Sequence, residues 1–368
     1  MMIEKIQLEN FKGFQSFSTD LTPITIFGGK NNSGKTSILE AIMFLYNHND
    51  PNVFFQMNFL RHMNDQNLYT AERLWEPLFF NFNTAETLQI ILSDDRGLSN
   101  KLYMYKSAEA AAYENLQSMR QAYPLNGALR QNYMLDFMYS SRSLTEEGRY
   151  GIVPAPVNMF DPNYRPVVIS YSRREEQADG KFVTAFLFKS ETMLEQNLLA
   201  QWYGNIFQNN RHKIIIEVLK CFDRHIVDVQ TIVKGAFGYL YAIFDDGRKF
   251  PVSYMGDGMN RLMNILLGIL SNPGSIILLD EIENGFHYSM YTKVWESIGK
   301  AAQENNCQII ANTHSADLLQ GAVDGLLKNG QQQELSYIRL DNSDGQVHAY
   351  FFDGDLISYA LKAEMEVR

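Results

Sequence analysis

Residues 29–36 have the types and the spacing of a loop that binds phosphate groups. Their sequence, GKNNSGKT, matches the pattern G-x-x-x-x-G-K-[ST], in which glycines let backbone N–H groups turn toward phosphate oxygens. In such a loop Lys35 would reach the β- and γ-phosphates, and the Thr36 hydroxyl would ligate Mg²⁺. The candidate nucleotide-binding residues are Gly29, Lys30, Asn31, Asn32, Ser33, Gly34, Lys35, Thr36 and Ser37.

The segments on either side of this loop predict the elements that must position it. Residues 24–27 are an apolar run typical of a buried strand, and residues 37–45 are typical of a helix. The N-terminus of that helix would add partial positive charge beside the phosphates. The alternative is a glycine-rich turn that carries a lysine by chance, and such a turn would not need a strand before it and a helix after it.

Two carboxylates follow a second apolar run. Residues 276–279 are Ile-Ile-Leu-Leu, and Asp280 and Glu281 come directly after them. A buried strand that ends here places both acids at the ligand edge of an open α/β sheet. Asp280 would hold Mg²⁺, and Glu281 would polarise the attacking water. The alternative is a strand that meets a charged loop by chance.

A third strand pattern, residues 308–311, leads to the same edge and is followed by Asn-Thr-His-Ser. His314 could there contact a γ-phosphate or order the attacking water, although a single histidine is more often structural. Upstream, residues 253–261 open a predicted helix with Ser253, Gly256 and Gly258, which offer a second anion site at a helix N-terminus. Helix capping alone would explain Ser253, but not the glycines that follow it.

Together with residues 10–14 (Asn-Phe-Lys-Gly-Phe), these segments resemble the ABC-type ATPase heads of the SMC, RecF and OLD group. The phosphate loop and residues 280–285 (Asp-Glu-Ile-Glu-Asn-Gly) are most similar to the stand-alone OLD-like ATPases of bacteria. The resemblance is dense over residues 1–50 and 250–368, and the middle of the chain matches only in outline.

The resemblance implies a head-to-tail pair of subunits, in which ATP bound by one phosphate loop is capped by a signature segment of the other subunit. That segment would hold Ser253, Gly256, Asp257 and Gly258. Lys12 would lie near the phosphates of its own subunit, and Glu283 and Asn284 would form the D-loop. Asp257 departs from transporter-type signatures, and an ionised carboxylate would repel a γ-phosphate. We therefore expect Asp257 to point away, toward Arg261.

The predicted fold class is α/β: an ABC-type P-loop ATPase head with a mixed central sheet, an N-terminal antiparallel β lobe and an inserted, mainly helical lobe. We assign residues 1–106 and 225–368 to the ATPase core and residues 107–224 to the insert. A hairpin over residues 87–105 would extend the N-terminal sheet. Prolines at 154–166 suggest a boundary, residues 167–171 have the pattern of a strand, and residues 191–207 have helical spacing. Long heptad arms are absent from the pattern.

The composition of the 368 residues fits a folded globular chain, because 45% of them are apolar. Two cysteines make no disulfide framework, and neither a secretory signal nor an apolar run of membrane length is evident, so we expect a cytoplasmic protein. The net charge of −10 argues against an extensive nucleic-acid-binding surface. Short basic runs at 173–174 and 211–213 leave a local groove possible, although such runs are usually solvated.

We expect no Toprim nuclease domain of the kind that many OLD proteins carry, because few residues follow His314. Residues 353–355 (Asp-Gly-Asp) mimic a Toprim motif, but we expect them to end a strand and cap the last helix. Residues 341–345 resemble a calcium loop superficially and are better interpreted as a hairpin turn.

The leading hypothesis is a Mg²⁺-dependent ATPase that forms a homodimer or higher homo-oligomer. It would act as sensor or motor for a separately encoded, nuclease-like effector in anti-phage defence, which the OLD-like resemblance suggests. The alternative is a RecF-like DNA-binding ATPase in DNA repair. DNA binding that depends on ATP and weakens with salt would favour this alternative. A transporter ATPase is disfavoured by the altered signature segment.

Overall fold

The fold is that of a computed structural model, which describes residues 2–50, 53, 75–106, 134–141, 144–153, 167–176, 183–189, 194–343 and 345–363. Its centre is a six-stranded mixed sheet in the order β16-β15-β3-β14-β13-β9. Five strands are parallel and β16 is antiparallel to β15, which confirms the predicted mixed sheet. The strands are β3 (Ile24–Gly29), β9 (Ala185–Phe188), β13 (Ile276–Leu279), β14 (Gln308–Asn312), β15 (Leu335–Ser343) and β16 (Gln346–Asp353).

A second, antiparallel sheet of seven strands forms the N-terminal lobe in the order β2-β1-β4-β5-β6-β7-β8. The predicted hairpin is confirmed as β4 and β5, which pair in antiparallel register. The strands are β1 (Ile3–Phe11), β2 (Phe14–Asp20), β4 (Leu88–Asp94), β5 (Ser99–Lys106), β6 (Met134–Ser140), β7 (Leu144–Val153) and β8 (Val167–Glu176).

The prediction of a mostly helical insert at 107–224 needs correction in its first part. Strands β6, β7 and β8 continue the antiparallel sheet, and β9 pairs with β13 in the central sheet. Buried Leu135, Phe137 and Tyr139 alternate along β6, which is the period of a strand. Among the described residues of this range, the helices are α5 (Gln196–Gln208) and α6 (His212–Leu219). The prolines at 154–166 lie outside the described residues, and the domain boundaries stay a prediction.

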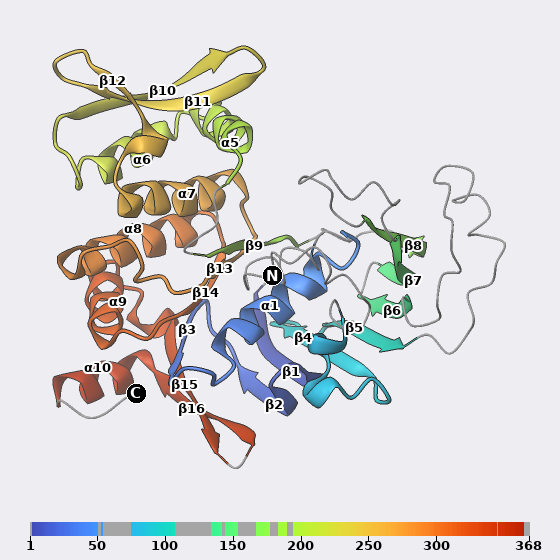
Figure 1. The fold of residues 1–368 in the computed structure, drawn as a ribbon. Coiled ribbons are helices and arrows are strands. Elements are labelled where there is room, and N and C mark those ends of the chain that lie inside the picture. Colours follow the sequence, from blue (N-terminus) through green and yellow to red (C-terminus); the bar gives the residue numbers. More distant parts are fainter. Residues whose placement is uncertain are drawn as a thin grey trace.

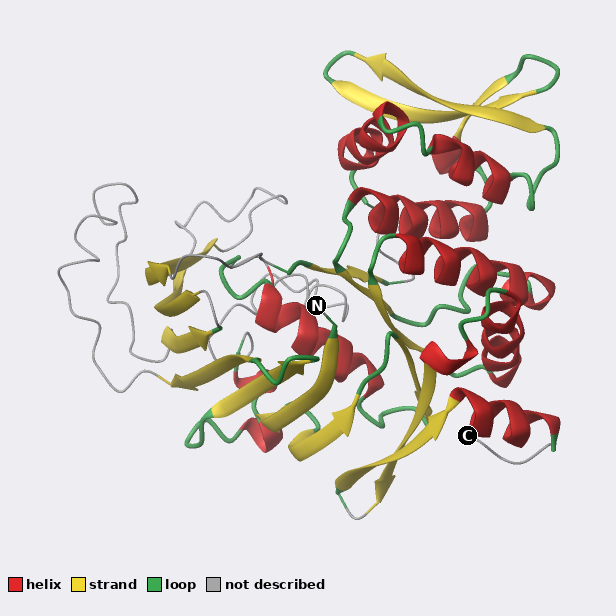
Figure 2. Ribbon diagram, turned by 180° about the vertical axis from the view of Figure 1, so that it is seen from behind, coloured by secondary structure: helices red, strands yellow, loops and turns green. Residues whose placement is uncertain are grey.

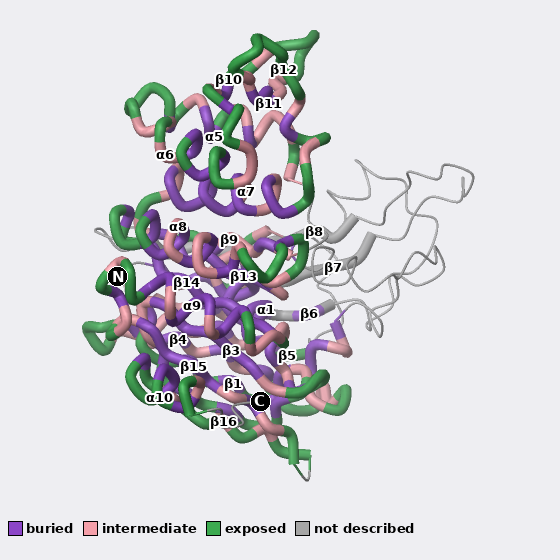
Figure 3. Tube along the Cα trace, turned by 90° about the vertical axis from the view of Figure 1, so that its left-hand side faces the viewer, coloured by how far each residue is buried: buried purple, intermediate pink, exposed green. Residues whose placement is uncertain are grey.

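Helix α1 (Lys35–Tyr46) lies between the two sheets, and a layer of helices covers the opposite face of the central sheet (Figures 1 and 2). Those helices are α7 (Asp257–Ser271), α8 (Tyr291–Glu304), α9 (Ala316–Lys328) and α10 (Gly354–Lys362). Along β13, Ile277 and Leu279 join the core with these helices, whereas Ile276 and Leu278 join the core with α1. The central sheet is therefore buried on both faces, as parallel sheets usually are (Figure 3).

A three-stranded sheet, β10 (Ile226–Lys234), β11 (Phe237–Phe244) and β12 (Lys249–Pro251), packs on α5 and α6. At the C-terminal end of the described chain, β15 and β16 form the predicted hairpin. The Asp353 carboxylate accepts a hydrogen bond from the Leu356 N–H at 2.8 Å, so it caps α10 as predicted. Within the described ranges, no helix has both the length and the apolar character that a membrane crossing requires.

Two glycines test the packing of the helical layer. Gly325 on α9 lies so close to α8 that an added Cβ would meet the Thr292 carbonyl oxygen at 2.5 Å, whereas Gly204 on α5 has open space around it. We predict that Gly325→Ala lowers the free energy of unfolding by about 1–3 kcal/mol through overpacking. The matched Gly204→Ala should raise it by about 0.5–1 kcal/mol, because alanine is the better helix former. Urea denaturation of both variants measures this, and equal effects would contradict the packing described.

Candidate active site

The phosphate loop connects β3 to α1, which confirms the predicted strand, loop and helix. Gly29 and Gly34 have φ of 122° and 95°, a backbone region that favours glycine. A Cβ on Gly29 would meet the Leu340 carbonyl oxygen at 2.1 Å, and one on Gly34 would meet the Phe14 ring at 2.5 Å. Both glycines are therefore needed for the backbone path and for the space around it.

Lys35 folds back over the loop that precedes it. Its Nζ donates hydrogen bonds to the carbonyl oxygens of Gly29 at 2.9 Å and Lys30 at 2.8 Å, and the residue is only 4% exposed. Burial lowers the pKa of the Lys35 ammonium from its usual 10.5 to about 8, although the acidic strand end nearby opposes this shift. Burying an unpaired charge costs free energy, so an anion bound beside the Lys35 ammonium would stabilise it.

The phosphate loop and the acidic strand end meet directly. The Thr36 hydroxyl donates a hydrogen bond to Asp280 Oδ1 at 3.0 Å, across 244 positions of sequence. Asn312, the last residue of β14, donates through Nδ2 to the same oxygen. A hydroxyl and a carboxylate are hard oxygen ligands, and Mg²⁺ commonly takes one or two protein oxygens beside phosphate and water. Thr36 and Asp280 therefore fit the predicted metal-ligand roles.

Glu281 follows Asp280 in an unusual backbone conformation. Its φ is 49°, a left-handed value that costs a non-glycine residue about 1–2 kcal/mol. The Glu281 N–H donates to Asn312 Oδ1 at 2.5 Å, and the preceding Asp280 carbonyl accepts from Arg261 Nη2 at 2.6 Å. The Glu281 carboxylate itself accepts from Asn284 Nδ2 at 2.8 Å. Its orientation is thus set by contacts from three separate elements.

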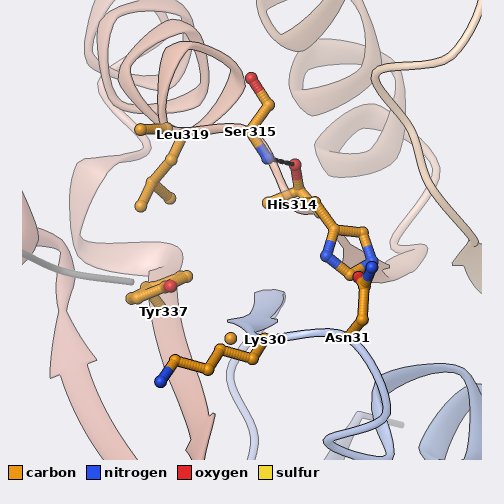
Figure 4. Close-up of a pocket in the computed structure, with 9 residues that line it drawn as sticks. Lys30, Asn31, His314, Ser315, Leu319 and Tyr337 are labelled. Atoms are coloured by element: carbon orange, nitrogen blue, oxygen red, sulfur yellow. Dashed lines mark hydrogen bonds between the residues drawn. The ribbon is translucent and has the colours of Figure 1, made fainter.

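The predicted residues Glu283 and His314 also come together at this edge. The His314 backbone N–H donates to Glu283 Oε1 at 2.7 Å, and the His314 side chain is exposed. Figure 4 shows His314 and Asn31 of the phosphate loop among the residues that line one pocket. A cavity of about 280 Å³ adjoins them, lined by Gly29, Lys30, Asn31, Thr313, His314, Ser315, Ala316, Leu319 and Tyr337.

Lys12 lies beside α1 rather than over the loop. It pairs with buried Glu40, which is four residues beyond Thr36, and Lys189 approaches the other oxygen of Glu40 at 3.3 Å. Lys12 and Lys189 come from the β1–β2 turn and from the end of β9. The phosphate contact of Lys12 stays a prediction.

The signature segment forms a short 3₁₀ turn (Val252–Tyr254) followed by α7, with Gly256 rather than Ser253 as the residue before the helix. Ser253, Gly256 and Asp257 are exposed, whereas Gly258 is buried and packs on the Gly285 carbonyl. The expected turn of Asp257 toward Arg261 is wrong, because the Arg261 guanidinium points instead to the Asp280 carbonyl.

Sequence reasoning missed the roles of Arg261 and Asn312. Burial lowers the pKa of the Arg261 guanidinium, while the carboxylates of Asp280, Glu283 and Glu281 act in the opposite direction. Asn312 was detectable in principle, because a polar residue that ends a buried strand at a ligand edge is a site signal. No comparable pattern in the sequence indicates the direction of the Arg261 side chain.

Comparison with known proteins supports the assignment of this site as one that binds and hydrolyses a nucleotide. A family model described as "AAA ATPase domain" matches residues 1–120, and one described as "AAA domain, putative AbiEii toxin, Type IV TA system" matches residues 173–320. An "ATP/GTP phosphatase" of Helicobacter pylori (strain ATCC 700392 / 26695) is 24% identical over 338 residues, which is 87% of each chain.

Among solved structures, an SMC head bound to the C-winged helix domain of ScpA matches with a TM-score of 0.50 and 13% identity, covering 98% of this chain and 100% of that one. The SMC head domain from Thermotoga maritima matches at 0.49 and 10% identity, over 96% and 100% of the two chains. Two family models of ATPase domains thus match separate parts of this chain, and together with the phosphatase relative they support ATP hydrolysis. The fold is a mixed α/β head like that of the SMC structures. The ATPase family matches indicate a nucleotide substrate.

The lowered pKa of Lys35 makes a prediction about pH. In the nucleotide-free protein Lys35 is charged below pH 8 and neutral well above it. Phosphate binding needs the charged amine, so ATP affinity should fall as pH rises above 8, by at most about tenfold per pH unit. Calorimetric titration on either side of this pH measures the change, with Lys35→Met as the pH-independent control. Equal affinities for the unsubstituted protein would contradict it.

Proposed function

We propose that this ATPase hydrolyses ATP with Mg²⁺ at the junction of the phosphate loop and the acidic strand end. The observation that carries the proposal is the hydrogen bond from Thr36 to Asp280, which joins the two halves of the site. Lys35 and the loop N–H groups would hold the β- and γ-phosphates. Glu281 would accept a proton from the attacking water as it approaches the γ-phosphorus in line.

Thr36 and Asp280 would hold the metal, Asp280 in part through water. A metal ion held by these two residues would supply positive charge against the negative charge that develops on the phosphate oxygens. Asn312 would keep the Asp280 carboxylate turned toward Thr36 through its hydrogen bond to Oδ1. His314, exposed beside the loop, would contact the γ-phosphate or order the water.

We further propose that two heads pair head to tail, so that the signature segment of each completes the site of the other. The exposure of Ser253, Gly256 and Asp257 supports this, because these residues are available to a second molecule. Gly258 packs on Gly285, close to Glu281 and Asn284, which links the signature segment to the D-loop in one subunit. The N-terminus of α7 would supply backbone donors to a γ-phosphate in trans.

The cellular role that we propose is that of a sensor or motor for a separately encoded effector, such as a Toprim-type nuclease, in anti-phage defence. Two points support it: the resemblance of the motifs to stand-alone OLD-like ATPases, and the family description that names a putative toxin of a type IV system. DNA binding by the head itself is the competing possibility.

The first test of the chemistry is Lys35→Ala. Loss of the only loop side chain proposed to reach both phosphates should reduce ATP turnover by at least about 10³-fold, in line with the loss of a charged group that stabilises a transition state. Phosphate release measures the turnover. Lys213→Ala removes an exposed lysine from α6 and should leave the rate unchanged. Turnover by Lys35→Ala at the parental rate would refute the site.

The second test is Glu281→Gln, which keeps the shape of the side chain but removes its basicity. We expect ATP to bind, hydrolysis to fall by about 10²–10⁴-fold, and a dimer to accumulate with ATP. Size-exclusion chromatography with light scattering detects the dimer, and Glu304→Gln on the exposed face of α8 is the matched control.

The Glu281→Gln protein also serves as bait for the effector. A partner that recognises paired heads should co-purify with Glu281→Gln in ATP and be absent from Lys35→Ala. Hydrolysis by Glu281→Gln at the parental rate would instead overturn the catalytic assignment.

A further inference from the structure

The peptide group between Asp280 and Glu281 is hydrogen-bonded at both of its ends. Arg261 donates to its carbonyl oxygen at 2.6 Å, and its N–H donates to Asn312 Oδ1 at 2.5 Å. Because a peptide group is planar, these two bonds together fix the rotation of the whole unit. That rotation sets the left-handed φ of 49° at Glu281 and hence the direction of its side chain.

The two groups that hold this peptide come from different elements. Asn312 ends β14, beside β13 in the central sheet, so its position is set by strand pairing. Arg261 comes from α7, four residues after Asp257 and therefore about one helical turn beyond the start of the signature helix. One side of the peptide is thus anchored to the sheet and the other to the helix that begins at the signature segment.

The surroundings of Arg261 are consistent with a single well-defined position. Asp280, Glu281 and Glu283 all act on its charge, and its Nε is buried without a hydrogen-bond partner among the described residues. Only the bond to the Asp280 carbonyl is recorded for this guanidinium in the described part of the chain. A displacement of α7 would therefore act directly on the Asp280–Glu281 peptide.

We propose that Arg261 is a positioning residue that couples the signature segment to the orientation of the Glu281 carboxylate through the Asp280–Glu281 peptide. The inference rests on the proposed function, in which Glu281 accepts the proton of the attacking water. When the signature segment engages the nucleotide of a second head, the shift of α7 moves Arg261 and rotates the peptide. The left-handed conformation of Glu281 favours this response, because other backbone conformations are intrinsically more stable.

The test separates positioning from structural support. Arg261→Met removes the donor but keeps an unbranched side chain, and it should lower kcat by about 10- to 100-fold, as expected for a misplaced catalytic group. ATP affinity should change by less than about twofold, since the hydrogen bond that Arg261 makes within the described chain goes to the Asp280 carbonyl and not to the phosphate loop. Arg261→Lys, which can still donate one hydrogen bond, should recover part of the rate.

The second readout uses the Glu281→Gln background, where the orientation of residue 281 no longer matters for hydrolysis. There Arg261→Met should leave the ATP-dependent dimer intact at the same ATP concentration. Arg248→Met, which removes an exposed arginine paired with Asp246 in the turn between β11 and β12, is the control and should change neither kcat nor the dimer. Thermal melting establishes whether each variant is folded. If Arg261→Met does not fold, kcat, ATP affinity and dimer formation are compared between Arg261→Lys and the unsubstituted protein instead.

Three outcomes are decisive. A reduced kcat with unchanged ATP affinity and an intact dimer supports the inference. Loss of the dimer, a proportional loss of ATP affinity, or a parental kcat in the Arg261 variants overturns it while leaving the proposed function in place. Parental hydrolysis by Glu281→Gln alone overturns the proposed function, and the inference falls with it.

Discussion

The site depends on the pairing of β3, β14 and β13 as adjacent parallel strands. Because these strands run in the same direction, their carboxyl ends deliver the phosphate loop, Asn312 and the Asp280–Glu281 pair to one edge. The hydrogen bonds among Thr36, Asp280 and Asn312 follow from that adjacency and cross very long stretches of sequence. A slip of β14 by a single residue would turn the side chains of that strand to opposite faces and take Asn312 away from Asp280.

Burial on both faces of the central sheet is what keeps this register. Alternate residues of β13 enter two separate cores, one with α7 to α9 and one with α1 and the antiparallel sheet. Helix α1 is thus a structural element of the second core and also the carrier of Lys35 and Thr36. The same packing that stabilises the fold therefore fixes the position of the groups that would meet the phosphates.

Local patterns in the sequence predicted the parts of the fold and site that are determined locally. The phosphate loop, the acidic strand end, the two hairpins and the Asp353 cap each depend on neighbouring residues, and each is present. The directions of Lys12 and Arg261 depend on partners far away in sequence, Glu40 and the Asp280 carbonyl, and no local pattern contains them. Strands β6 and β7 were missed because a single strand is ambiguous until its neighbours in the sheet are known, whereas the strand expected at 167–171 is present as the start of β8.

The contact of Gly258 with the Gly285 carbonyl has a consequence for how the molecule can change. A methyl group at position 258 would come within 2.4 Å of that oxygen, so the two backbones touch without intervening side chains. A direct contact between two backbones passes on a displacement almost fully, because no side chain lies between them that could change its rotamer. The segments around Gly258 and Gly285 then move together, so a molecule that binds and displaces one of them also displaces the other.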